Sequence, residues 1–556
     1  MSFRCWRVIL MRKLMRDKLL SAKQFIQQGK IPEALQLLEA SLDTTATVET
    51  LVLLASTYFS QGRFKSAAGY FRRLTELFPE DFQHLNNLGV TLEAQGDFAG
   101  ALYTYRKAIA LAPRYQKAHY HLGNLLQRMG ELAEAKIVYQ HALTLDDKNV
   151  SILINLAIIY LHQDEAHAAV ILLKKATHYS PQHFDGWLNL GYAYYILFEL
   201  ENAHRSYARA QKLSPRSPLI FNNIGLLLQA KGEYTEARDA FQHALTLNPD
   251  FIEAKHNLGL LALGQFQFEE GWRGYHARPT RRYTSLPLPQ YKNTAIYQGY
   301  PLFIHSEQGL GDEFFFMRFF PGLINQGIDA YYYTTSKSYA PLSRSLGSRI
   351  VNKPPSHAMG SHVLLGDLPY IMGIDAITKI PSALPLCPDV NHLKRMRNKL
   401  STLPKPWIGI TWRAGMPGIN QLAKAIPLEQ LLGIFLEFTG TLIILQREPT
   451  AQELALISQC GLRCVIHNAA NANADLEDSL AVLALLDEYI TVNNTNVHLR
   501  DGLNLPSKVL IPWPPEWRWG NDITASPWFK NCAIYRENKG KQWNTALALL
   551  KNTLAC

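Results

Sequence analysis

The first half of the chain repeats one pattern of apolar and small residues every 34 positions. In each period an aliphatic residue precedes a small one, a second small residue follows twelve positions later, and an aromatic residue or leucine comes four after that. Small residues such as Gly89 and Ala101 allow two helices to approach closely, so each period predicts a pair of packed helices. The seven opening pairs are Leu54-Ala55, Leu88-Gly89, Leu122-Gly123, Leu156-Ala157, Leu190-Gly191, Ile224-Gly225 and Leu258-Gly259.

Turn residues recur at matching places in this period. Prolines such as Pro113 end the second helix of a unit, because proline inside a helix would break it. Glycines stand where the first helix must stop, at Gly62, Gly96, Gly130 and Gly232. The pattern resembles the tetratricopeptide repeat, which implies an α-solenoid with a concave groove for a partner. We expect this solenoid over residues 18–277, with residues 18–45 as a degenerate first unit after a basic extension, residues 1–17.

Beyond Arg278 the period disappears, and short apolar runs alternate with amphipathic stretches. Residues 278–297 contain clustered prolines and are predicted to be a linker. Strands are expected at 301–306, 330–334, 362–365, 407–412, 441–446, 463–467, 489–492 and 508–511, and helices at 313–326, 428–438, 451–460 and 479–486. This alternation predicts parallel sheets with helices on both faces, in two domains over 298–400 and 401–556. The expected fold class is therefore α + α/β.

Four segments of this second half resemble the two-domain GT-B glycosyltransferases, in particular the heptosyltransferase-like group (glycosyltransferase family 9-like). They are His305-Ser306-Glu307-Gln308-Gly309-Leu310-Gly311-Asp312, Gly409-Ile410-Thr411-Trp412-Arg413-Ala414-Gly415, Asn493-Asn494-Thr495-Asn496-Val497-His498, and Glu516-Trp517-Arg518-Trp519-Gly520 with Ser526-Pro527-Trp528. The resemblance implies two Rossmann-like domains, with the acceptor on the N-terminal side and a nucleotide-activated sugar on the C-terminal side. It implies inverting transfer to a hydroxyl group.

The first segment places a glycine-rich loop, with Gln308, Gly309 and Gly311, between a predicted strand and a predicted helix. Glycines there allow the backbone to approach a ligand closely. In similar heptosyltransferases the residue that matches Asp312 is regarded as the general base that deprotonates the acceptor hydroxyl. The alternative is that Asp312 is the N-cap of the helix, for which aspartate is well suited.

The donor needs cations, because the departing diphosphate gains negative charge as the glycosidic bond breaks. Arg413 follows a predicted strand, and Lys424 precedes a proline-led helix, so both are candidates; the alternative is ordinary surface charge. No Asp-x-Asp pair lies in the four segments, so we expect no obligatory divalent metal and no cofactor.

Asn493, Asn494 and Thr495 leave a strand and enter a helix, whose free N–H groups suit a pyrophosphate. Many relatives have Asp-Thr or Asp-Ser at this place, so the loss of the carboxylate puts any role that needs it in doubt. His498 is a donor-site candidate, although histidine is more often a structural hydrogen-bonding residue.

Asparagine recurs in the repeats, two positions before the small residue of the opening pair. The positions are Asn87, Asn155, Asn189, Asn223 and Asn257, with His121 in the one gap. A carboxamide can pair with a peptide group of any sequence, and O-GlcNAc transferase has a similar ladder that holds its substrate backbone. The resemblance implies an acceptor-binding ladder; the alternative is hydrogen bonding within or between repeats.

The net charge and the cysteines narrow the possible ligands and the cellular compartment but do not alter the predicted fold. A net charge of +10 suits phosphate-bearing ligands, acidic proteins or nucleic acid, and the lack of a nucleic-acid-binding signature disfavours the last. No apolar run approaches the ~18 residues of a membrane span, and the stretch Val8–Met11 is too short for a signal peptide. Six scattered cysteines form no disulfide framework, so we expect a cytoplasmic protein.

Together these features predict a glycosyltransferase that moves sugar from a nucleotide-activated donor to a protein or peptide recruited by the repeats. One alternative is an interaction scaffold whose GT-B half is inactive. This alternative is supported by Asn493 and Arg500, because similar glycosyltransferases have other residues at these two positions. A second alternative is transfer to lipopolysaccharide or another glycan, which leaves the repeats unexplained. The oligomeric state is not predicted.

Overall fold

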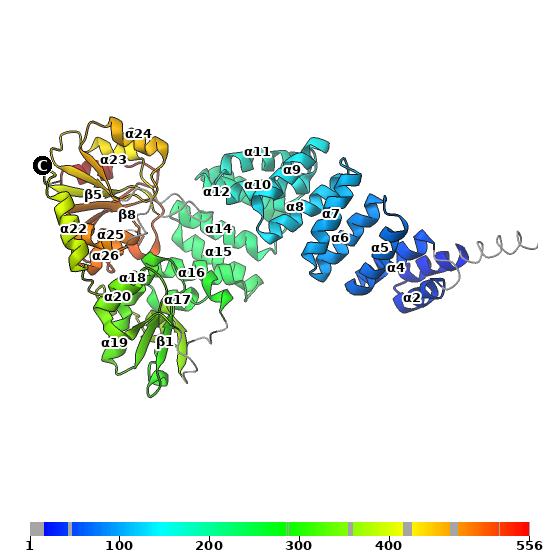
Figure 1. Cartoon of the computed structure of the whole chain (residues 1–556), viewed down its shortest axis with the longest axis horizontal. Helices are drawn as coiled ribbons and strands as arrows, with labels where there is room; N and C mark the ends of the chain where they lie inside the picture. The colour runs from blue at the N-terminus through cyan, green and yellow to red at the C-terminus, as the bar shows by residue number, and fades with distance from the viewer. Residues whose placement is uncertain are drawn as a thin grey trace, which may run out of the picture. The chain divides into compact units, whose positions relative to one another are not determined.

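The structure is a computed structural model of the chain (Figure 1). It describes residues 16–42, 47–284, 286, 289–353, 360–414, 425–467, 476–521 and 523–554. The chain forms two compact units, Met1–Leu190 and Gly191–Cys556, and each is described by itself. Within the described ranges, no helix combines the length and the hydropathy that a bilayer crossing requires.

The first unit is built of paired antiparallel helices, as the 34-residue period predicts. A helix at 16–27 precedes the regular series, and α12 (Phe184–Ile196) crosses the division between the units. The series is α2 (Ile31–Glu39), α4 (Val48–Ser60), α5 (Phe64–Leu77), α6 (Phe82–Gln95), α7 (Phe98–Leu111), α8 (Gln116–Met129), α9 (Leu132–Leu145), α10 (Val150–His162) and α11 (Ala166–Tyr179).

Small residues hold the two helices of each pair together. A Cβ added to Gly89 would lie 2.5 Å from the ring of Tyr105, so only glycine leaves room for that ring. The first helices end as expected: Gly96 has a φ of 89° and is the left-handed C-cap of α6. One and two periods after Gly130, the same turn is made by Asp164 and Phe198, with φ of 61° and 60°.

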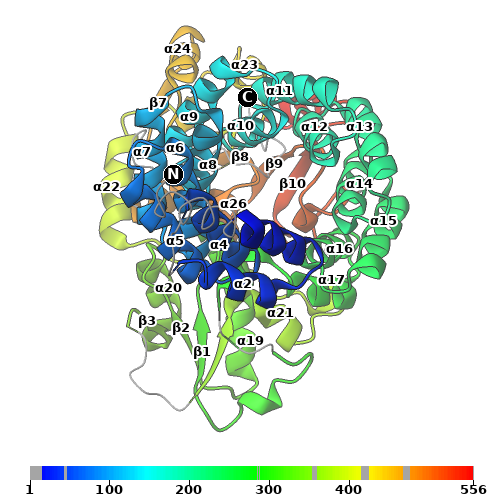
Figure 2. The same cartoon turned by 90° about the vertical axis from the view of Figure 1, so that its right-hand side faces the viewer.

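The second unit begins with five more repeat helices, which Figure 2 shows stacked one after another. They are α13 (Leu200–Leu213), α14 (Pro218–Lys231), α15 (Tyr234–Leu247), α16 (Ile252–Gly264) and α17 (Phe268–Tyr275). The stretch 278–297, predicted as a linker, contains the 3-10 helices η1 (Pro279–Tyr283) and η2 (Ala295–Tyr297). Its Arg278 and Arg281 are buried, so the start of this stretch is packed into the unit.

A four-stranded parallel sheet follows, with the strand order β3-β2-β1-β4. Three of its strands are predicted, and β3 is additional. The predicted helix over 313–326 is divided by a 3-10 turn because Pro321 has no N–H to donate to Met317. The elements are β1 (Leu302–His305), α18 (Leu310–Phe316), η3 (Met317–Phe319), α19 (Phe320–Asn325), β2 (Ala330–Tyr333), α20 (Tyr339–Leu346), η4 (Gly347–Arg349), β3 (Ile350–Val351), β4 (Ser361–Leu364), η5 (Leu365–Asp367), α21 (Leu368–Ile371) and η6 (Ile377–Lys379).

The remaining strands form a six-stranded parallel sheet in the order β10-β9-β8-β5-β6-β7. The prediction of parallel sheets is thus confirmed, and β10 is the strand that it lacked. The elements are α22 (Val390–Leu400), β5 (Trp407–Thr411), α23 (Leu428–Gly433), β6 (Thr441–Ile444), α24 (Ala451–Gln459), β7 (Cys464–Ile466), α25 (Leu476–Leu485), β8 (Glu488–Val492), α26 (Thr495–Gly502), β9 (Ser507–Ile511), η7 (Trp517–Trp519), β10 (Cys532–Arg536) and α27 (Asn544–Lys551).

Alternating side chains of the larger sheet enter two cores. Ile408 and Ile410 of β5 pack with α23, α24 and α27 on one face. The other face packs against α25 and α26, and its core continues to Trp272 of the last repeat helix and to Phe315 beside the smaller sheet. The last repeat and both sheets therefore share one hydrophobic core within the second unit.

Candidate functional site

A cavity of about 340 Å³ opens at the carboxyl ends of strands from both sheets. Its lining comes from the glycine-rich loop after β1, the segments after β5 and β6, the start of α26 after β8, and η7. In parallel sheets these strand ends, with the helices that start there, are where ligands bind. Among the described residues, the charged members of the lining are three arginines, Arg413, Arg447 and Arg518, and one aspartate, Asp312. Arginines outnumber carboxylates in this lining, which favours an anionic ligand, although each arginine is also paired with a carboxylate: Arg413 with Glu453, Arg447 with Glu448, and Arg518 with Asp312 and Glu516.

Asp312 lies in the first turn of α18, where the helix dipole favours a carboxylate. The N-cap of α18 is Gly309, so the alternative role of Asp312 as N-cap does not hold. Its carboxylate forms an ion pair with Arg518 through Oδ1, and no described residue hydrogen-bonds its Oδ2. The side chain of Asp312 is 34% exposed, whereas that of Arg518 is 8% exposed. Asp312 is thus anchored on one side and accessible from the cavity.

Arg518, like Arg447, is a charged lining residue that the sequence interpretation missed. It stands in an aromatic segment, whose tryptophans indicate packing, and its guanidinium lies 4.3 Å from the ring centroid of Phe315. It donates to Glu516 at 2.8 Å and pairs with Asp312. Burial opposes its charge, but Glu516 and Asp312 outweigh burial and raise the pKa of Arg518. Arg518 and Asp312 are 206 positions apart in the sequence, so no local sequence pattern predicts that they form a pair.

The three predicted residues of the glycine-rich loop have different surroundings. A Cβ on Gly309 would meet open space, which leaves the backbone accessible to a ligand. A Cβ on Gly311 would lie 3.3 Å from the ring of His498, so this glycine brings α18 close to α26. Gln308 does not line the cavity and instead exchanges hydrogen bonds with the hydroxyl of Tyr275.

Arg413 lines the cavity, as predicted, but its charge is already paired. Its Nε lies 3.0 Å from Glu453 Oε1 and its Nη2 donates to the carbonyl of Glu448. Although burial works in the opposite direction, Arg413 and Trp412 hold the pKa of Glu453 below its usual value. The second predicted cation, Lys424, lies outside the described residues.

Asn493, Asn494, Thr495 and His498 all line the cavity. Asn494 is the N-cap of α26 and accepts from the backbone N–H of Asn496 at 2.9 Å. Asn493 donates to Glu516 at 3.2 Å, and its buried Oδ1 has no partner among the described residues. That oxygen is suited to accept a hydrogen bond from a ligand hydroxyl or amide. His498 packs against the rings of Phe315 and Phe529, which also contact each other.

From the sequence, Arg500 supports an inactive site, because relatives differ at this position. In the structure, Arg500 is absent from the described lining of the cavity. It is 1% exposed and donates to the backbone carbonyls of Leu483, Leu486 and Pro506. Burial lowers the pKa of Arg500 to about 10. Its role is therefore to connect α25, α26 and the approach to β9.

The ladder asparagines lie on the first helices of their repeats, and several have partners there. Asn155 donates to Asn124 at 2.8 Å, and Asn257 donates to Asn222 at 2.8 Å, so each joins two consecutive repeats. Asn189 donates to the carbonyl of Asp185 in its own helix. Two members of the ladder, Asn223 and Asn257, line a second cavity of about 520 Å³ in the second unit. Asn87, a further member, lies on α6.

Two family models match the helical part of the chain. A tetratricopeptide-repeat model matches residues 52–116, and the model of the cilia and flagella-associated protein 70 C-terminal domain matches residues 115–250. Residues 52–250 form tetratricopeptide repeats. The comparison with curated proteins found no match.

Several solved structures are similar to the tetratricopeptide repeats. YrrB, described as having an unusual peptide-binding site, is 22% identical over 34% of this chain and 96% of its own, with a TM-score of 0.30. A tetratricopeptide repeat protein from Parabacteroides merdae is 16% identical over 44% and 98%, with a TM-score of 0.37. PilF of Pseudomonas aeruginosa is 18% identical over 37% and 94%, with a TM-score of 0.34.

Proposed function

We propose that the protein is a glycosyltransferase that moves a sugar from a nucleotide-activated donor to a hydroxyl group of a protein or peptide. The proposal treats the two parallel sheets as the two Rossmann-like halves of a GT-B enzyme. The observation that supports it best is the cavity at the strand ends of both sheets, whose described lining contains one accessible carboxylate, Asp312, and three arginines. A transferase of this kind needs a base for the acceptor and positive charge for the leaving diphosphate.

In the proposed reaction the acceptor oxygen attacks the anomeric carbon while the bond from that carbon to the phosphate oxygen breaks. Asp312 takes the proton of the attacking hydroxyl, and its Oδ2 is available for this because Arg518 holds Oδ1. The anomeric configuration inverts, since the nucleophile enters opposite to the leaving nucleoside diphosphate. The expectation that no divalent metal is needed remains part of the proposal.

The donor is proposed to lie against the second sheet. Arg413 and Arg447 are proposed to contact its phosphates while each also pairs with a carboxylate, Glu453 and Glu448, and the first residues of α26 line the same cavity. The unpartnered Oδ1 of Asn493 is suited to a hydroxyl of a sugar or ribose. A carboxylate at position 493, as in many relatives, would repel the phosphates, so asparagine is compatible with donor binding.

The repeats are proposed to recruit the acceptor. Stacked helix pairs present a continuous concave face, and such faces bind extended chains. Unlike transfer to lipopolysaccharide, this role gives the repeats a function in the reaction.

The test is the variant Asp312→Asn. Loss of a general base costs about 10²- to 10⁴-fold in rate, whereas the neutral amide fills the same volume. Sugar transfer is measured by mass spectrometry of acceptor proteins, and donor affinity by calorimetry. Asp329→Asn is the matched control, because Asp329 also pairs with an arginine beside the first sheet, at 3.2 Å from Arg349, outside the cavity. Full turnover by Asp312→Asn contradicts the mechanism, and a wild-type protein that binds no nucleotide-sugar supports the scaffold alternative.

A further inference from the structure

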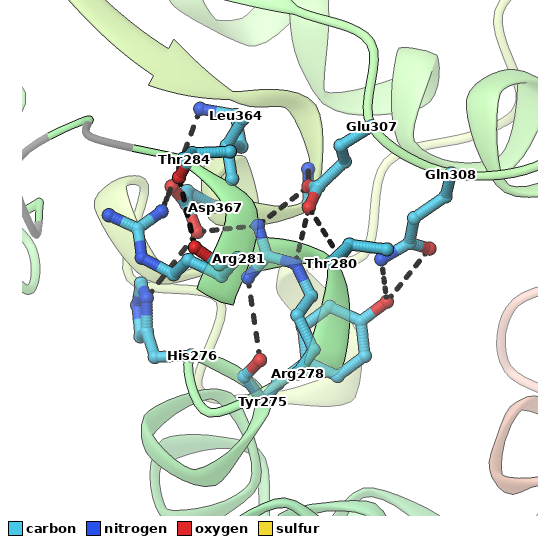
Figure 3. Close-up of polar contacts among 11 residues, drawn as sticks. Tyr275, His276, Arg278, Thr280, Arg281, Thr284, Glu307, Gln308, Leu364 and Asp367 are labelled. Atoms are coloured by element: carbon cyan, nitrogen blue, oxygen red, sulfur yellow. Dashed lines mark hydrogen bonds and ion pairs between the residues drawn. The ribbon is translucent and has the colours of Figure 1, made fainter. Parts of the chain in front are cut away.

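The glycine-rich loop is attached to the end of the repeat array by buried ion pairs (Figure 3). Arg278, three residues after α17, donates through Nε to Glu307 Oε2 at 2.8 Å and through Nη2 to Glu307 Oε1 at 2.6 Å. Thr280 donates to the same carboxylate at 3.0 Å. Glu307 also accepts from the backbone N–H of Gly366 at 2.9 Å. One carboxylate therefore links the repeats, the glycine-rich loop and the turn after β4.

The network continues to a second buried carboxylate. Arg278 Nη2 lies 2.8 Å from Asp367 Oδ1, and Arg281 Nη1 lies 2.5 Å from Asp367 Oδ2. The side chains of Arg278, Glu307 and Asp367 are 2%, 4% and 0% exposed. Two arginines thus face two carboxylates in the interior, and the planar fork of Arg278 fixes the geometry of Glu307 by binding both of its oxygens.

A second connection joins the repeats to the next residue of the loop. Tyr275, the last residue of α17, exchanges hydrogen bonds of 2.8 and 3.1 Å with the side-chain amide of Gln308. Its ring packs edge-on against Trp272 and Trp517, so the hydroxyl has a fixed position. Burial, and next the charge of Asp312, raise the pKa of Tyr275, so its hydroxyl stays protonated and keeps its proton for the hydrogen bond to Gln308.

We infer that Tyr275 and Arg278 are positioning residues for the loop that carries Asp312. Glu307 and Gln308 precede Asp312 by five and four residues. The helix α18 begins between Gln308 and Asp312, at Leu310. Displacement of this loop moves Asp312 relative to the acceptor, and a shift of about 1 Å can cost about 100-fold in rate. The catalytic consequence rests on the proposed function, whereas the positioning itself can be measured without any reaction.

Hydrogen exchange of the full chain tests the positioning directly. The variants are Tyr275→Phe, which removes only the hydroxyl, and Arg278→Lys, which keeps the charge but loses the fork. We expect the amides of residues 306–312 to exchange at least about fivefold faster in both variants, as the loss of one hydrogen bond predicts. If Arg278→Lys fails to fold, Tyr275→Phe alone decides the matter.

Matched controls lie in the same unit. Tyr207→Phe makes the same change at the equivalent position two repeats earlier, and Tyr207 is also buried. Arg238→Lys alters an arginine that donates to both oxygens of Glu270 at 2.6 Å within the repeats. Unchanged exchange at 306–312 in Tyr275→Phe overturns the inference, and so does an equal increase in Tyr207→Phe.

Kinetics separate positioning from donor binding. If the loop positions Asp312, Tyr275→Phe lowers kcat for transfer by about 10- to 100-fold while KM for the donor stays within about twofold. A rise in KM alone overturns the positioning of the base. If the wild type transfers no sugar, the proposed function fails, and the exchange experiment still decides whether the repeats position the loop.

Discussion

His276, at the edge of the buried ion-pair network, makes the stability of the second unit depend on pH. The side chain is 14% exposed, its ring lies 4.1 Å from that of Tyr370, and its Nδ1 is 3.4 Å from Asp367. Burial lowers the pKa of His276 to about 4; Asp367 opposes this shift, and Arg278 and Arg281 reinforce it. The folded protein therefore holds this imidazole neutral at pH values where an unfolded chain protonates it.

The size of the effect follows from the two pKa values. Above about pH 6.5 the imidazole is neutral in both states, and its contribution to stability is constant. As the pH falls from 6.5 toward 4, the unfolded chain binds a proton that the folded chain excludes, so stability is lost. The loss from this one residue is about 2 kcal/mol at pH 5 and approaches about 3 kcal/mol below pH 4.

The perturbation is His276→Gln, which keeps a polar side chain but cannot titrate. Urea unfolding is followed by tryptophan fluorescence, because eight of the ten tryptophans lie in Gly191–Cys556. The free energy of unfolding of the wild type should fall by about 2 kcal/mol more than that of the variant between pH 7.5 and pH 5. Other titrating groups are common to both proteins and cancel in this difference.

His256→Gln offers an independent comparison. Burial lowers the pKa of His256 to about 4, and Arg278 acts in the same direction. The variant should therefore show a second reduction of the pH dependence. Equal pH dependence in His276→Gln and the wild type would refute the reasoning, because it would mean that His276 titrates alike in both states.

Three further outcomes are expected. Arg413→Ala should weaken nucleotide-sugar affinity by about tenfold or more in calorimetry, because a charge-assisted hydrogen bond is lost; unchanged affinity places the donor elsewhere. Asp164→Gly should stabilise the first unit by about 1 kcal/mol in thermal unfolding, because a φ of 61° strains any residue with a Cβ, and a lower melting temperature contradicts this. Asn257→Ala should destabilise the second unit by about 1–3 kcal/mol in urea unfolding, because the buried Oδ1 of Asn222 loses its partner; full stability instead favours a ligand-binding ladder.

The repeats and most strands could be predicted because their signals are local. A 34-residue period and short apolar runs identify helix pairs and central strands wherever they pack. The two strands that were missed are at sheet edges, where one side has no neighbour and burial is weaker. β3 has only two residues, and β10 contains the exposed Ala533 and the half-buried Arg536.

The connection between the repeats and the first sheet could not be predicted in this way. Arg-Pro-Thr-Arg-Arg after α17 has the composition of a linker, and composition cannot reveal that Arg278 meets Glu307 and Asp367 from other parts of the chain. The same applies to Arg518, whose partner Asp312 lies in α18, the helix that follows β1 of the smaller sheet. Ion pairs of this kind form when segments distant in sequence pack together. The local periodicity of the sequence therefore cannot predict them.

The buried network around Arg278 is better explained by geometry than by stability. Removing charges from water costs several kcal/mol per ion, and apolar replacements of buried ion pairs are often as stable as the originals. An apolar contact, however, would let the glycine-rich loop slide, because dispersion forces have no preferred direction. The fork of Arg278 holds both oxygens of Glu307, the residue that precedes Gln308, and Arg278 and Arg281 together hold Asp367. The end of the last repeat helix, through Tyr275 and Arg278, is therefore structurally connected to the loop of Asp312.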